Sequence, residues 1–164
     1  MRAFPAGADE AVERSANVVI RTDFSDDGGW LGTLEALEQA PEDWEDDEFE
    51  VDNFVIDDPS WAEATPDEIL EVVRRDQYLA EYLDVFLVAD KQAVAGEEHL
   101  LLVVTAYDPQ DEMYDDVVRF GREFRCLPSE AHSIIANLGV GNMDFQEFSK
   151  AAAASSDGVF RGWP

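Results

Sequence analysis

Two apolar runs in the middle of the chain constrain its fold more than any other feature. Asp84–Asp90 reads DVFLVAD and His99–Tyr107 reads HLLLVVTAY. Apolar residues occupy both parities of each run, which is typical of strands that are covered on both faces of a sheet. The connection over residues 91–98 is long enough to join antiparallel neighbours and too short for a crossover helix. We therefore expect two central, antiparallel strands.

Strand and helix patterns alternate around this pair. Asn17–Thr22 and Val51–Ile56 are predicted strands. Val117–Leu127 alternates between apolar and polar residues, as a strand with one buried face does. The clearest helix start is Thr65, a capping residue followed by a proline and, three residues on, by a glutamate. The predicted order β-α-β-α-β-β-β-α-α indicates an α/β (or α+β) fold, with a mixed sheet of about five strands and helices on both faces.

The length and the apolar content suit one domain. The chain has 164 residues, of which 46% are hydrophobic, enough for a substantial core. We expect a mobile N-terminal arm over residues 1–16, because this segment has no apolar run, and a single globular domain over 17–164. The arm lacks the pattern of a secretory signal, and the apolar runs are too short to span a bilayer. A cytoplasmic protein is the expectation.

The charge is unbalanced and unevenly distributed. The chain carries 38 acidic and 11 basic residues, a net charge of −27. Residues 1–116 hold 33 of the acids and 6 of the bases, while residues 117–164 hold five of each. Such a charge repels nucleic acid and anionic membrane surfaces, so we expect direct binding to neither.

Two acidic runs also carry aromatic or apolar residues. Glu42–Asp52 has eight acids in eleven residues, and Asp108–Asp116 has five in nine. Charged runs are often solvated loops that keep a protein soluble. Carboxylates mixed with aromatic anchors are also typical of a surface that docks a basic protein. The candidate partner-binding residues are Trp44, Glu45, Asp46, Asp47, Glu48, Phe49, Asp111, Glu112, Tyr114 and Asp115.

A second group of carboxylates follows the predicted strands. Asp23, Asp57 and Asp90 stand at positions that become the carboxyl ends of strands, where open α/β sheets bind ligands. Converging oxygens of this kind suit Mg²⁺, so these three residues are the candidate metal ligands and Mg²⁺ is the weaker alternative to having no cofactor. Helix caps and turns explain the same residues equally well. Lys91 lies beside the last of them.

Other chemistry finds little support in the sequence. The single cysteine, Cys126, excludes an internal disulfide and a multi-cysteine metal site, and it lies on the apolar parity of its strand. Neither histidine has a nucleophile at a motif spacing, and no glycine-rich phosphate loop follows a strand. An enzyme is therefore disfavoured. Arg119, Arg122 and Arg125 form the only basic cluster; pairing with nearby acids is the expectation, and an anion site is the alternative.

Several motifs together resemble a family of small acidic bacterial proteins known only as a domain of unknown function. They are VIRTDF (Val19–Phe24), FLVAD (Phe86–Asp90), FRCLPSE (Phe124–Glu130), NLxxxNMDFxEF (Asn137–Phe148) and DGVFRG (Asp157–Gly162). The resemblance covers residues from about 19 to 162, nearly the whole predicted fold. It implies no activity and no catalytic residues.

Two hypotheses follow from the residues. The first is a non-enzymatic acidic binding module, for example an immunity or inhibitor protein, that engages a basic protein partner. The alternative is a metal-dependent or small-molecule-binding protein that uses the strand-end carboxylates.

Overall fold

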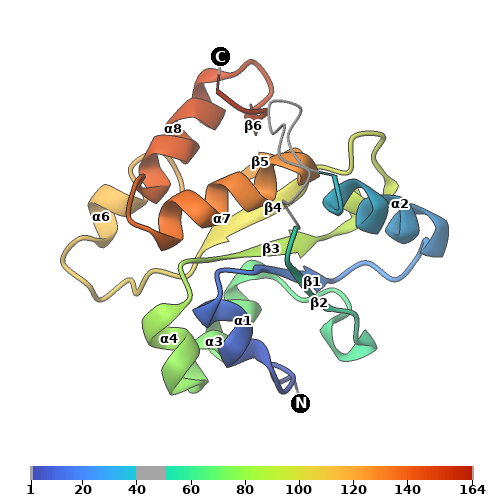
Figure 1. The fold of residues 1–164 in the computed structure, drawn as a ribbon, viewed down its shortest axis with the longest axis horizontal. Coiled ribbons are helices and arrows are strands. Elements are labelled where there is room, and N and C mark those ends of the chain that lie inside the picture. The colour runs from blue at the N-terminus through green and yellow to red at the C-terminus, as the bar shows by residue number, and fades with distance from the viewer. Residues whose placement is uncertain (1, 40–50, 164) are drawn as a thin grey trace.

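The computed structural model describes residues 2–39 and 51–163, which form a six-stranded mixed sheet flanked by helices (Figure 1). The strand order is β2-β1-β3-β4-β5-β6. Strand β4 runs antiparallel to both of its neighbours, and the other pairs are parallel. The predicted mixed α/β single domain is confirmed. The strands are β1 (Asn17–Arg21), β2 (Asn53–Ile56), β3 (Val85–Ala89), β4 (Leu101–Thr105), β5 (Glu123–Cys126) and β6 (Val159–Phe160).

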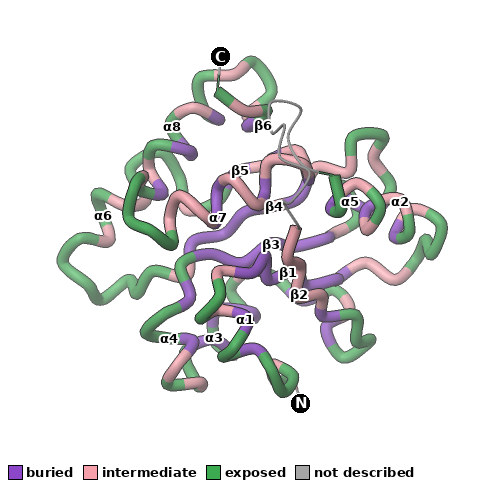
Figure 2. The backbone as a smooth tube through the Cα atoms, viewed as in Figure 1, coloured by how far each residue is buried: buried purple, intermediate pink, exposed green. Residues whose placement is uncertain are grey.

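The expected central pair is confirmed by β3 and β4. All five residues of β3 are buried, and its register runs antiparallel to β4 from Val85 opposite Thr105 to Val88 opposite Leu102. The connection between them holds only a short helix, α5 (Lys91–Ala95). Figure 2 shows these strands as buried tube through the middle of the molecule.

Two apolar clusters cover the two faces of the sheet. Alternation along β1 divides its side chains, so that Val19 joins one cluster while Val18 and Ile20 join the other. The first cluster is covered by α2 (Asp27–Leu37), α5, α7 (Ala131–Gly139) and α8 (Phe145–Ala154). The second is covered by α1 (Ala8–Glu13), α3 (Pro66–Arg75) and α4 (Gln77–Tyr82). Shorter turns complete the fold: η1 (Pro59–Trp61), α6 (Tyr114–Val117) and η2 (Pro128–Glu130).

The N-terminal segment differs from the arm that the sequence predicts. Ala8 and Ala11 are buried on one side of α1. The ring of Phe4 lies 5.3 Å from the ring of buried Trp61, and Arg2 donates to Glu68 at 2.7 Å. Residues 2–16 therefore pack against the domain. Two alanines and one phenylalanine are enough to anchor a short helix, although they make no apolar run in the sequence.

The strand predicted over Val117–Leu127 is shorter in the structure. Only Glu123–Cys126 pairs as β5, and within it Phe124 and Cys126 are buried as the alternation predicts. Upstream, the chain turns at Gly121, whose φ of 106° is a conformation that glycine adopts easily. This turn ends the extended pattern that the sequence suggested. Among the described residues, no helix has the length and apolar character needed to cross a membrane.

Candidate functional site

The strand-end carboxylates lie where the sequence places them, at the carboxyl ends of β1, β2 and β3. Asp57 accepts hydrogen bonds from Arg21 Nη1 at 3.2 Å and from Trp30 Nε1 at 3.1 Å. Asp90 receives a bidentate pair from Arg125, at 2.8 and 2.7 Å. Asp23 Oδ1 accepts from the hydroxyl of Ser25 at 2.8 Å. Asp57 and Asp90 are thus paired with arginines, whereas Asp23 Oδ2 is buried without a hydrogen-bond partner among the described residues.

Arg21 organises this end of the sheet. Its side chain is only 6% exposed, and besides Asp57 it donates to Asp27 Oδ1 at 2.9 Å and to the Asp23 carbonyl at 2.9 Å. Its guanidinium carbon lies 4.3 Å from the ring centre of Phe24 and 5.0 Å from that of Trp30. Sequence reasoning missed this residue. The available signal was an arginine at the end of an otherwise apolar strand, where an unpaired charge would be costly.

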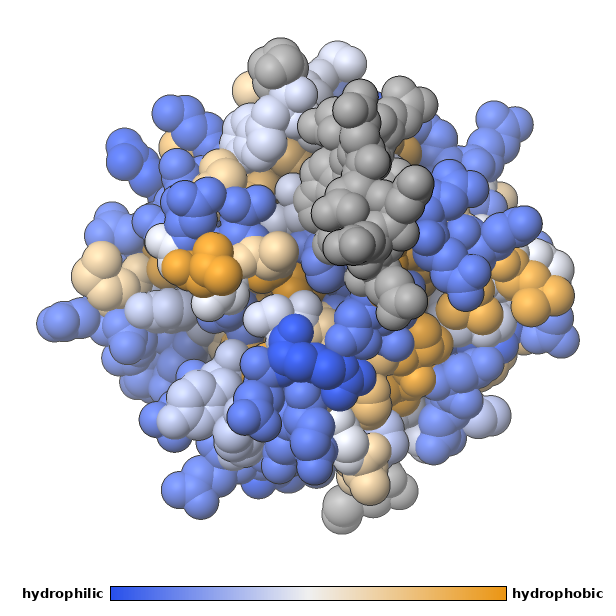
Figure 3. Space-filling view, viewed as in Figure 1, coloured by the Kyte–Doolittle hydropathy of each residue, from blue (hydrophilic) through white to orange (hydrophobic). Residues whose placement is uncertain are grey.

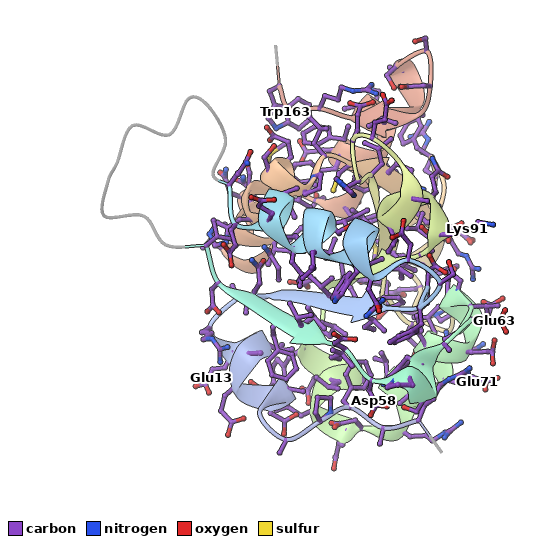
Figure 4. All side chains as sticks on the ribbon, turned by 90° about the vertical axis from the view of Figure 1, so that its right-hand side faces the viewer. Glu13, Asp58, Glu63, Glu71, Lys91 and Trp163 are labelled. Carbon is purple, nitrogen blue, oxygen red and sulfur yellow. The ribbon has the colours of Figure 1, made fainter. Side chains whose placement is uncertain are left out.

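Two of the three candidate metal ligands, Asp57 and Asp90, form ion pairs with arginines. Within residues 2–39 and 51–163, no group of three or more His, Cys, Asp or Glu side chains is arranged to hold a metal. The guanidiniums of Arg21 and Arg125 already supply the positive charge that Mg²⁺ would bring to Asp57 and Asp90. In Figure 4 the β1 arrow points toward the side of the molecule on which Lys91 and Glu63 lie, and both side chains are exposed there.

The second acidic run lies between β4 and β5, toward the opposite end of β3. Asp111, Glu112 and Asp115 are exposed, and Tyr114 is partly buried as the first residue of α6. The carboxylate of Asp111 accepts from the backbone N–H of Met113 at 2.9 Å. Met113 is 48% exposed on this turn. The run is therefore an ordered surface carrying both carboxylates and an apolar side chain.

An open hollow of about 230 Å³ lies beside this run. It is formed by the start of β3, the end of β4, α6, the end of α7 and the start of α8. Its apolar lining comes from Val85, Met113, Val117, Leu138, Met143 and Phe145. In Figure 3, which has the view of Figure 1, an apolar patch surrounded by hydrophilic residues lies over the end of α7. We call this hollow, with Asp84, Asp111, Glu112, Asp115 and Asp144, the amino-end surface.

The acids of the amino-end surface have no cationic partner within the described part of the chain: none forms an ion pair there. Asp84 and Asp144 line the hollow itself. Burial raises the pKa of the Asp84 carboxyl, because neighbouring atoms displace water from its charged form. Burial, together with the carboxylates of Asp111 and Glu112, raises the pKa of Tyr107 on the lining. The surface thus combines an apolar hollow with carboxylates that form no ion pair in the described part of the chain.

The other predicted residues are placed as follows. Trp44, Glu45, Asp46, Asp47, Glu48 and Phe49 lie outside the described residues. The expected pairing of the basic cluster is confirmed for two of its members, since Arg125 binds Asp90 and Arg122 Nη1 donates to Asp67 at 2.6 Å. Cys126 is fully buried, and burial raises the pKa of its thiol.

Comparison with known proteins identifies a family that matches this sequence. A family model described as Domain of unknown function (DUF6924) matches residues 16–163. No curated protein matches the sequence. The match supports the resemblance to a domain of unknown function that the sequence motifs suggested, and it begins one residue before β1.

Proposed function

The chain belongs to the family described as Domain of unknown function (DUF6924), and from its surface we propose that it is a non-enzymatic binding protein that engages a basic protein partner. The family description states no activity, so the support for a function comes from the surface of this protein. We assign the contact to the amino-end surface.

One observation carries the proposal: an apolar hollow is bordered by carboxylates that no described cation neutralises. Neighbouring carboxylates repel one another, and a cationic partner that approaches them relieves this repulsion. The hollow offers the apolar contact area from which protein interfaces obtain much of their affinity. The two features together favour a protein partner over a small ion.

An inhibitor or immunity protein is the specific role that we propose. Such a protein acts by covering a surface of its target and needs no catalytic group. A concentrated negative field accelerates encounter with a basic target by about 10- to 1,000-fold, and the advantage falls as salt is added. Fast capture is what an inhibitor of a harmful basic protein requires.

The test compares two variants that change the net charge equally. The first replaces Asp111, Glu112 and Asp115 on the amino-end surface by Asn, Gln and Asn. The control replaces the exposed residues Glu35, Glu38 and Glu97 by Gln. The first two lie on α2 and at its end, on the opposite side of Figure 1 from α6, and Glu97 follows α5. Association with the basic partner isolated at low salt is measured by stopped-flow fluorescence.

We expect the first variant to associate about tenfold more slowly than the wild type, and the control to change by less than about twofold. Equal slowing by both variants would mean that only the total charge matters and would remove the assignment to this surface. Unchanged rates in both would overturn the proposal that a basic partner is steered by the acids.

A further inference from the structure

Asp84 is an acid of the amino-end surface that lines two hollows. It lines the hollow of about 230 Å³ and also a second, much smaller one of about 30 Å³. The smaller hollow lies against the end of α4, where Tyr82 is 54% exposed. The larger one lies against α6, α7 and α8.

The backbone fixes Asp84, while its carboxylate has no partner. The Asp84 carbonyl accepts from the N–H of Ala106 at 2.9 Å, which extends the β3–β4 pairing by one step. No hydrogen bond or ion pair to its side chain is found among residues 2–39 and 51–163. Asp84 is exposed, so a cationic group of a partner can reach its carboxylate and form a charge-assisted hydrogen bond with it.

The two hollows differ in what they can admit. The larger one has room for one bulky apolar side chain and offers it Met113, Leu138 and Met143. The smaller one has about the volume of a water molecule, so it admits no side chain. Tyr82 lies beside it and is 54% exposed, with its ring 4.7 Å from that of Tyr78, and such an exposed aromatic residue can contact a guanidinium.

We infer, on the basis of the proposed function, that the partner presents an arginine to Asp84 and an adjacent bulky apolar side chain to the larger hollow. A basic and apolar pair satisfies both the unpaired carboxylate and the apolar lining. A second copy of this chain does not fit, because its own net charge of −27 repels the surface. The occupant is therefore a segment of a different, basic protein.

Two synthetic peptides of equal charge test this inference. The probe is acetyl-GRFRG-amide, and acetyl-GRGRG-amide lacks only the apolar side chain. Each is titrated at low salt into the isotope-labelled full chain, and binding is followed by backbone amide shifts in an NMR spectrum. The variants are Asp84→Asn and, as a matched control of equal charge change, Glu35→Gln on α2.

We expect GRFRG to bind about tenfold more tightly than GRGRG and to shift the amides of Leu138, Met143 and Phe145. Asp84→Asn should weaken GRFRG binding by about tenfold, the effect of losing a charged hydrogen bond, while Glu35→Gln should weaken it by less than twofold.

Three other results would overturn the inference in different ways. Equal binding of the two peptides, with shifts confined to the acidic loop, removes the role of the hollow and leaves the proposed function intact. Equal weakening by Asp84→Asn and Glu35→Gln removes the role of Asp84. If neither peptide binds, and partner association is insensitive to the triple variant, the inference and the proposed function are both wrong.

Discussion

The two ends of β3 present the same residue type in opposite electrostatic situations. At its carboxyl end, Asp90 is held by both nitrogens of the Arg125 fork. At its amino end, Asp84 has no cation among the described residues, although it is only six positions earlier in the chain. The role of an acid in this protein therefore depends on whether the fold brings a guanidinium to it.

This difference separates structural from functional carboxylates. A paired acid is stabilised by its own protein, so its removal should weaken the fold. An acid without a cationic partner contributes no ion pair to the fold, so its removal should cost no stability and should impair only what it binds. The following substitutions test this distinction.

The largest effect is expected at Arg21, the buried centre of the carboxyl end. Arg21→Met keeps much of the side-chain volume and removes the charge. We expect it to lower the free energy of unfolding by about 3 kcal/mol, the upper end of the range for losing charged hydrogen bonds, because the bonds to Asp27, Asp57 and the Asp23 carbonyl are lost together. Urea denaturation followed by circular dichroism measures the change. Arg21→Lys keeps the charge but not the planar guanidinium, so it should lower the free energy of unfolding by less. Equal decreases for the two variants would contradict a role for the charge.

Asp90 should give an intermediate effect. Asp90→Asn keeps a side-chain oxygen that can accept from the Ala93 N–H at the start of α5. The loss of stability therefore reflects mainly the ion pair with Arg125. We expect the free energy of unfolding to fall by about 2 kcal/mol, as is typical of a charged hydrogen-bonded pair. A double-mutant cycle with Arg125→Gln isolates the coupling. A coupling below about 0.5 kcal/mol would place this pair with weak surface ion pairs instead.

The smallest effect, and the one of opposite sign, is expected at Asp84. Its pKa is raised in the folded state, so the carboxylate favours folding when protonated and this contribution is lost as the pH rises through the folded pKa. At pH 7, Asp84→Asn should therefore raise the free energy of unfolding, by a few tenths of a kcal/mol as suits an exposed site. Thermal melts from pH 7 downward should show that the stability difference between Asp84→Asn and the wild type becomes smaller as the pH approaches 3.8, the ordinary pKa of an aspartate. A less stable variant at pH 7 would show that Asp84 supports the fold, like Asp90.

Much of the fold was predictable because its signals are local. The capping box at Thr65 forms as predicted, with the Glu68 N–H donating to the threonine hydroxyl and the Thr65 N–H donating to the glutamate, both at 3.2 Å. The central strands β3 and β4 follow from apolar runs alone. Such patterns are decided by neighbours a few residues apart, so the sequence displays them directly.

The candidate site was only partly predictable. The acidic loop and its residues Asp111, Glu112, Tyr114 and Asp115 were recognised from composition. Asp84 and the hollow were not, because the lining comes from five elements distributed over residues 84–146. Nothing in the spacing of Met113, Leu138 and Met143 indicates that they meet.

The sequence by itself determined the layered α/β architecture, the strong negative charge and the absence of cysteine pairing, since these depend on composition and short-range periodicity. Only the tertiary structure decided which carboxylates are neutralised. Arg125 reaches Asp90 across 35 positions of the chain, whereas no described guanidinium reaches Asp84. Charge neutralisation acts over a few ångströms in space, and folding alone sets which charges come that close.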